Sequence, residues 1–214
     1  MRETGVPAAV ARAPMRAARP QNFRDRWAQP TKEFMRLRYR GVVRRLAHGY
    51  YIAPPEGVEA GTWKPDLETA AMGVATARYG DRVPVLMGIG AARFHRALPR
   101  AIGETFVAVP EQARARELDD DVGLVIFVTR DTAAIDARLE QFETGRALVA
   151  TPEQTVLDVA HRPDWGGGAA LATEIITALW PRVDDEHLNV LATRQGRHAA
   201  RERAARVAAK DAAL

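Results

Sequence analysis

The stretch FMRLRYRGVVRRLAHGYYIAPP, residues 34–55, decides how the first part of the chain folds. Apolar residues at helical spacing in its first part predict a helix over 31–40 that ends at Gly41. The apolar and basic segments that follow predict a β-hairpin over 42–53, with His48-Gly49 as its turn. Glycine suits a two-residue connection because it accepts a positive φ. A helix followed by a basic hairpin is therefore expected here.

The segments before this stretch complete the expected domain. Residues 23–29 read as a short helix that Pro30 stops. Residues 1–20 are Ala, Arg and Pro with little periodicity, and are expected to form a loose arm or a partial first helix. Helix, turn, helix and basic hairpin is the order of elements in a winged helix-turn-helix. We therefore expect residues 1–61 to hold a basic arm and a winged-helix DNA-binding domain with its linker.

A second domain, a mixed α/β unit, is expected over residues 62–214. Asp66 can cap a helix whose apolar residues repeat at amphipathic spacing until Gly80. Thr151 and Pro152 open another helix, because Thr is a good N-cap and Pro fits the first helical position. Strands are expected at 105–109, 123–129 and 147–150, and further helices at about 169–180, at 185–193 and from 196 onward. The fold class that follows is α+β.

Charge is distributed unevenly along the chain. Residues 1–50 hold 12 basic and 3 acidic side chains, a net charge of +9. Residues 51–193 hold 13 basic and 22 acidic ones, a net of −9, and residues 194–214 hold 6 and 2, a net of +4. A cationic segment of this kind indicates binding to a polyanion, and we expect nucleic-acid phosphate to be that partner. The alternative is an arginine-rich surface that serves solubility alone.

The cations near the predicted hairpin form the expected DNA-binding surface. Lys32, Arg36 and Arg40 repeat at helical spacing, so they lie along one face of the predicted recognition helix. Arg36 is expected to reach base edges, while Arg44 on the predicted wing strand is expected to contact phosphate. The full set of DNA-contacting residues that we expect is Lys32, Arg36, Arg38, Arg40, Arg44, Arg45, His48 and Tyr50.

The sequence offers little support for catalysis. It contains no His-Glu-x-x-His zinc motif, no phosphate loop and no Gly-x-Ser-x-Gly elbow. Gly88-Ile89-Gly90 begins like a dinucleotide fingerprint, but Arg93 stands where the third glycine belongs, and a close-packed turn before a helix is the preferred interpretation. The acidic triplet 119–121 is expected to be a solvated loop. We therefore expect no enzyme activity, no cofactor and no metal.

The sequence also indicates the compartment in which the protein is expected to work. The chain has no cysteine, so disulfides and thiolate metal sites are excluded. No apolar run approaches the ~20 residues that span a bilayer, and no signal-peptide pattern is present. A cytoplasmic protein without a membrane partner is expected.

Three segments carry a resemblance to a known family. Residues 34–51 resemble the end of the winged-helix domain of AbiEi-type antitoxins, which includes the MenA-like proteins. Residues 88–98 are similar to the small-residue helix of that family, which ends in an apolar-His pair and a Leu. Residues 150–158 resemble its strand, Thr/Ser-Pro-Glu helix start and Leu-Asp element. The three segments occur in the family's order.

The resemblance implies a type IV antitoxin that also binds operator DNA and represses its own operon. Its partners would be double-stranded operator DNA and a nucleotidyltransferase toxin encoded beside it. It also implies that residues 62–214 neutralise the toxin, and we expect this part to fold and act alone. The alternative is a stand-alone winged-helix transcriptional regulator whose C-terminal domain senses a ligand or is purely structural. A third reading is a hydrolase or transferase with an unrecognised site.

Overall fold

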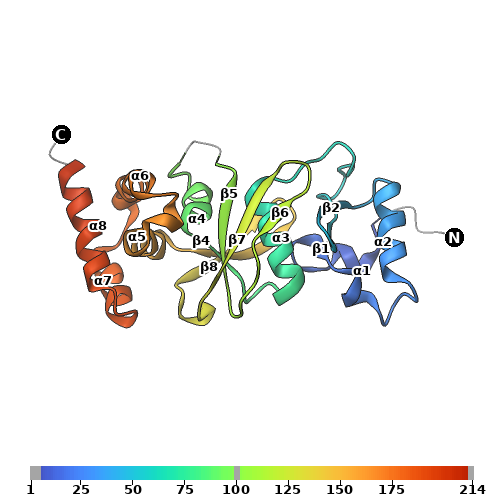
Figure 1. Cartoon of the computed structure of the whole chain (residues 1–214), viewed down its shortest axis with the longest axis horizontal. Helices are drawn as coiled ribbons and strands as arrows, with labels where there is room; N and C mark the ends of the chain where they lie inside the picture. Colours follow the sequence, from blue (N-terminus) through green and yellow to red (C-terminus); the bar gives the residue numbers. More distant parts are fainter. Residues whose placement is uncertain (1–5, 99–101, 212–214) are drawn as a thin grey trace.

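The computed structural model describes residues 6–98 and 102–211. Its N-terminal part is a three-stranded antiparallel sheet with short helices on one side, drawn in blue in Figure 1. The elements are α1 (Ala8–Ala11), η1 (Pro14–Arg16), β1 (Ala17–Ala18), η2 (Pro20–Phe23), α2 (Pro30–Tyr39), β2 (Arg44–Ala47) and β3 (Tyr50–Ile52), where η denotes a 3-10 helix. The strand order is β1-β3-β2, so the first strand pairs with the last one of this part.

Two local predictions are confirmed in this part. Helix α2 covers the segment expected to be helical, and β2 and β3 form the expected hairpin. Gly49 has a φ of +78°, the left-handed conformation that this turn requires. The helix is held inward by Phe34 and Leu37, which are buried in a small core with Phe23 and Tyr51.

Two other predictions are wrong. Residues 23–29 do not form a helix: bonds from the amides of Arg26 and Trp27 to the carbonyl of Phe23 close a single turn only. The segment cannot continue as a helix because Pro30 disfavours the helical conformation at Gln29, which has φ −137° and ψ 71°. Of the two forms expected for the segment before Phe23, the loose arm is also wrong, since Val10 and Met15 are buried and β1 belongs to the sheet, whereas the short helix α1 agrees with the partial first helix.

The centre of the molecule is a six-stranded mixed sheet. Its strands are β4 (Val85–Met87), β5 (Glu104–Val109), β6 (Arg116–Leu118), β7 (Gly123–Thr129), β8 (Ala137–Phe142) and β9 (Gly145–Ala150), in the order β6-β7-β5-β4-β9-β8. β4 pairs with β9, and β5 with β7, in parallel, whereas the remaining neighbours are antiparallel. The three strands expected from sequence are present as β5, β7 and β9. Mixed helix and strand around this sheet agrees with the α+β class.

Helix α3 (Leu67–Tyr79) lies between the two sheets (Figure 1). Its start is as expected, because the Asp66 side chain accepts a hydrogen bond from the amide of Thr69. The helix is not amphipathic, however, since all residues from Thr69 to Ala77 are buried. It is covered on both sides, by the small sheet and by the six-stranded sheet. A Cβ at Gly73 would lie 2.9 Å from Leu46 Cδ1, so any larger residue at this position would have to displace the Leu46 side chain.

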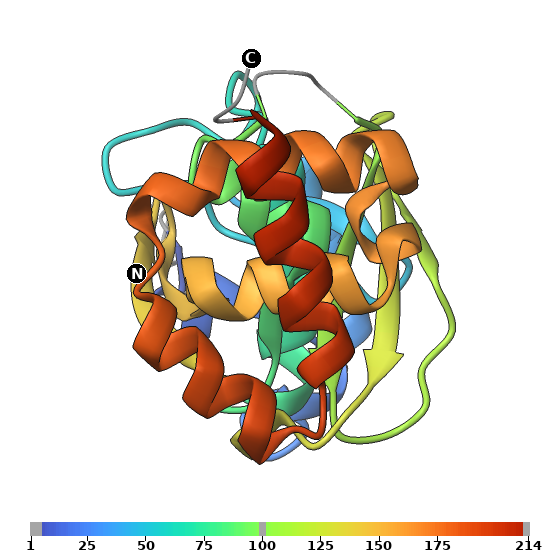
Figure 2. The same cartoon turned by 90° about the vertical axis from the view of Figure 1, so that its left-hand side faces the viewer.

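Helices lie on the opposite face of the six-stranded sheet, where α4 (Gly88–Phe94) and α5 (Pro152–His161) contact the strands. An outer layer packs on α5 and consists of α6 (Ala169–Leu179), α7 (Asp185–Arg194) and α8 (His198–Asp211). The short 3-10 turns are η3 (Thr132–Ala134), η4 (Pro163–Gly166) and η5 (Trp180–Arg182). In Figure 2 the outermost helix, α8, crosses over α5. The glycines of α4 serve packing, as preferred above: a Cβ at Gly90 would lie 2.2 Å from Thr105 Oγ1.

The main hydrophobic core is shared across the predicted domain boundary. It contains Leu46, Tyr50 and Ile52 of the N-terminal part together with α3 and the six-stranded sheet. The boundary at residue 61 therefore separates segments that bury each other. The expectation that residues 62–214 form an independent core does not fit this packing, because removing the small sheet would expose one side of α3. Within the described residues, no helix is long and apolar enough to cross a membrane.

Candidate nucleic-acid interface

The outer surface of α2 is exposed and cationic. Phe34 and Leu37 face the small core, so the opposite side of the helix faces solvent. Met35 and Tyr39, four residues apart on that side, are 51% and 91% exposed. The basic side chains of the helix and its C-cap are all exposed; they are Lys32, Arg36, Arg38 and Arg40.

The helix has two different flanks. Lys32 and Arg36 lie beside Glu33, in a hollow that the segment 26–29 completes. There Arg36 Nη1 lies 2.6 Å from Glu33 Oε1, so its charge is partly neutralised. On the other flank Thr31, Met35 and Arg38 line a groove that the hairpin completes. The flank expected to contact DNA bases, with Lys32 and Arg36, is therefore not the flank that faces the hairpin.

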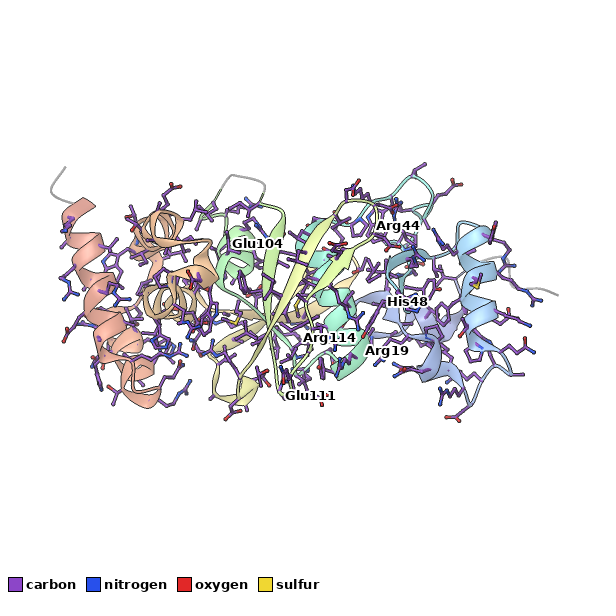
Figure 3. The ribbon with its side chains drawn as sticks, in the orientation of Figure 1. Arg19, Arg44, His48, Glu104, Glu111 and Arg114 are labelled. Carbon is purple, nitrogen blue, oxygen red and sulfur yellow. The ribbon has the colours of Figure 1, made fainter. Side chains whose placement is uncertain are left out.

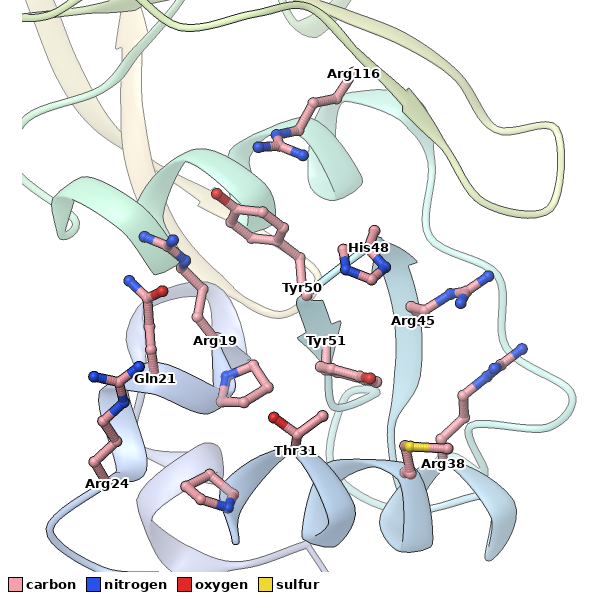
Figure 4. A pocket seen from close by; sticks show the side chains of 14 residues that line it. Arg19, Gln21, Arg24, Thr31, Arg38, Arg45, His48, Tyr50, Tyr51 and Arg116 are labelled. Carbon is pink, nitrogen blue, oxygen red and sulfur yellow. The ribbon is translucent and has the colours of Figure 1, made fainter.

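The groove between α2 and the hairpin is strongly basic (Figure 4). Its volume is about 560 Å³. The residues that line it are Arg19, Pro20, Gln21, Arg24, Pro30, Thr31, Met35, Arg38, Arg45, His48, Gly49, Tyr50, Tyr51 and Arg116. Five of these are arginines, and none is an aspartate or a glutamate. A concave surface lined by one sign of charge focuses the field and attracts anions.

Tyr50 holds two of the groove's arginines in place. The Cζ atoms of Arg19 and Arg116 lie over its ring, 5.2 and 5.0 Å from the centroid. Such cation–π contacts stabilise a guanidinium without neutralising it. Tyr50 itself is only 3% exposed, so the expectation that it contacts DNA directly does not fit its burial. The Tyr50 ring instead supports the guanidinium groups of the two arginines.

The wing arginines are paired with the acidic turn between β6 and β7. Arg44 Nη2 lies 2.8 Å from Asp120 Oδ2, and the same guanidinium donates to the carbonyls of Ala60 and Trp63. Arg45 pairs with Asp119, and this hydrogen bond raises the pKa of Arg45 above its ordinary value. The prediction that the acidic triplet is a solvated loop is therefore wrong for two of its members, because Asp119 and Asp120 hold the hairpin through these ion pairs.

Four of the groove's arginines have no such partner among the residues that the structure describes. Within the described part of the chain, no carboxylate lies within ion-pair distance of Arg19, Arg24, Arg38 or Arg116. His48 is exposed at the turn of the hairpin, and Figure 3 shows it together with Arg19 and Arg44 near the junction of the two parts. The free positive charge of this region thus belongs to the groove and α2 rather than to the strand of the wing.

Sequence reasoning missed Arg19, Arg24 and Arg116. Arg19 and Arg24 lie in the segment that was expected to be an arm and a helix, although the excess of arginine there was a signal. No such signal existed for Arg116, because it lies on β6 in the acidic part of the chain and approaches the Tyr50 ring of the hairpin only in the folded protein.

The basic C-terminal segment is turned inward. Arg197 Nη1 lies 2.6 Å from Asp158 Oδ1, and Arg130 Nη1 lies 2.8 Å from Asp158 Oδ2. Arg203 donates to the carbonyl of Ala160, and Arg201 pairs with Asp185. Much of the charge of this segment is therefore used within the protein.

One polar cluster outside the groove has catalytic residue types. His187 Nε2 lies 3.0 Å from Asp136 Oδ2, and Thr151 Oγ1 donates to the same oxygen at 2.6 Å. Thr151 also caps α5 by accepting from the amide of Gln154, and it is buried. This arrangement ties α5 and α7 to the start of β8. Among the described residues, no group of three or more His, Asp or Glu side chains could hold a metal ion.

Comparison with known proteins identifies a fold relative. No family model and no curated protein matches the chain. Among solved structures, the chain is similar to the RV2827C protein from Mycobacterium tuberculosis, with 20% sequence identity and a TM-score of 0.57. The match covers 90% of this chain and 71% of that one. The likeness therefore extends over the N-terminal part, the sheet and the helices, and it is a likeness of fold.

Proposed function

We propose that this chain is a DNA-binding antitoxin of the AbiEi type, which represses its own operon and counters a nucleotidyltransferase toxin. Its N-terminal part would be a compact winged helix-turn-helix. The order α1, β1, η2, α2, β2, β3 supports this reading, as does the pairing of the first strand with the last. In this interpretation α2 is the recognition helix and the β2–β3 hairpin is the wing.

The observation that carries the DNA-binding part is the set of cations around α2, because four of them, Arg19, Arg24, Arg38 and Arg116, have no carboxylate partner among the described residues. Lys and Arg that neutralise phosphates supply most of the affinity of non-specific DNA binding. The exposed cations of α2 lie beside a groove whose lining residues include five arginines and no aspartate or glutamate. Met35 and Tyr39 add exposed apolar surface to the same helix, which is the type of contact that thymine methyl groups accept.

The DNA-binding part is tested by titrating the full chain with the duplex that precedes its own gene. Neutralising roughly five phosphates gives a slope of log affinity against log salt near −4.5. A scrambled duplex of equal length serves as the control, and the operator should bind more tightly. A slope near −1, or equal affinity for both duplexes, would contradict a sequence-reading repressor.

The antitoxin part is tested by co-expressing the full chain with a nucleotidyltransferase encoded beside it. We expect growth to be restored, whereas an unrelated DNA-binding protein should leave the arrest unchanged. The alternative function, a stand-alone regulator, predicts repression of its promoter with no protection. Both functions therefore predict binding to the operator duplex, but only the antitoxin function predicts that growth is restored.

A further inference from the structure

We propose that the groove between α2 and the hairpin is a binding site for the phosphate backbone of duplex DNA, and that Arg116 from β6 completes it. The inference rests on the proposed DNA-binding function and deepens it. It makes the central sheet part of the DNA-binding surface. It also assigns the Thr31–Met35–Arg38 flank of α2 to the DNA, in place of the Lys32–Arg36 flank.

The charge of the groove is the first argument. Arg19, Arg24, Arg38 and Arg116 converge on one concave surface without a carboxylate partner among the described residues. Like charges gathered in this way repel each other, and a polyanion relieves that repulsion. By contrast, Arg36 on the other flank is already paired with Glu33, whose carboxylate would itself repel phosphate.

The second argument is preorganisation. Arg19 and Arg116 approach the Tyr50 ring from separate segments, so their long side chains are held before any ligand arrives. Ordering an arginine on binding costs conformational entropy, and a prior contact reduces this cost. The pairs of Arg44 with Asp120 and of Arg45 with Asp119 fix the hairpin relative to β6. These two ion pairs thereby set the distance between the hairpin side of the groove and Arg116 on β6.

The third argument concerns which anion fits. The arginines without a carboxylate partner among the described residues come from the two ends of η2, from α2 and from β6, so they are spread along the groove instead of surrounding one point (Figure 4). A small anion would use two or three of them, whereas a backbone with successive phosphates uses them all. The exposed Met35 on the groove flank places an apolar contact beside this backbone site, where a base edge would lie.

Two matched pairs of variants test the proposal on the full chain. Arg116→Ala is compared with Arg114→Ala, an exposed arginine two residues away that does not line the groove. Arg38→Ala is compared with Arg36→Ala on the other flank of α2. We expect Arg116→Ala to weaken operator and scrambled duplex by a similar factor and to flatten the salt slope by about one unit. Arg114→Ala should leave the slope unchanged, and Arg38→Ala should cost more affinity than Arg36→Ala.

Controls separate this proposal from the function on which it rests. Arg116→Lys keeps the charge and should keep the salt slope, which excludes a mere folding defect. If the wild type binds DNA steeply but Arg116→Ala and Arg114→Ala behave alike, the proposed site is wrong and the proposed function stands. If the wild type binds no DNA, both are wrong. If inorganic phosphate saturates the groove while duplex DNA does not bind, the groove is a small-anion site and the proposal is overturned.

Discussion

At the scale of single residues, the buried carboxylate of Asp158 holds several segments of the protein together. This carboxylate is fully buried and accepts from Arg130 on one oxygen and from Arg197 and Gln154 on the other. Removing one partner of a buried charge cluster leaves the others uncompensated, which costs about 3–5 kcal/mol. We therefore expect Asp158→Asn, which keeps the shape but removes the charge, to lower the free energy of unfolding by about that amount. Urea denaturation measures it.

The matched control for this prediction is Glu111→Gln. Glu111 pairs with Arg78 across 3.4 Å at the surface, and its side chain is 65% exposed. An exposed pair contributes less than about 1 kcal/mol. Equal losses for the two variants would show that Asp158 does not organise the cluster that joins α5 to the residue before α8 and the residue after β7.

At the scale of elements, α3 is the helix on which both sheets depend. Gly73 faces the small sheet, where an added Cβ would meet Leu46, Ala17 and Ile52. We expect Gly73→Val to overpack this contact and to cost about 1–3 kcal/mol. In a background where Trp63, Trp165 and Trp180 are replaced by Phe, so that fluorescence reports on Trp27 and the N-terminal part alone, fluorescence and far-UV circular dichroism should shift to the same lower midpoint, because the core is shared.

The comparison for this element is Gly61→Val, where an added Cβ meets nothing within 4 Å. A surface change of this kind alters stability by no more than about 0.5 kcal/mol. If Gly73→Val shifted the fluorescence midpoint alone, the N-terminal part would be an independently folding domain, as the sequence had indicated.

At the scale of the whole molecule, the two proposed activities can be separated only by point variants. Truncation at residue 61 would uncover α3, so loss of activity in a fragment would report on folding. The double variant Arg38→Ala/Arg116→Ala changes two side chains at the groove and leaves α4 to α8 untouched. We expect it to lose repression of a reporter joined to its own promoter, yet to protect cells from the toxin. If a well-folded double variant lost protection as well, DNA binding and neutralisation would share one surface.

Local signals were enough to place many of the elements. Gly41 ends α2, Gly49 turns the hairpin, Asp66 caps α3, and Thr151 with Pro152 begins α5. Each of these features acts within one turn or one pair of strands, so its physical cause lies in neighbouring residues. The α+β class and the three strands around which the sheet is built followed from the same kind of signal. Local patterns also marked the cations of α2 correctly as exposed.

Contacts between distant segments were decided by the tertiary structure alone. The sequence by itself determined a cationic start, an acidic middle and a cationic end. It could not determine that Asp119 and Asp120 would neutralise Arg45 and Arg44, or that Arg116 would reach the Tyr50 ring. Nor could a helical repeat in α3 reveal a second sheet on its far side. These features depend on which surfaces bury each other, and burial is a property of the packed chain as a whole.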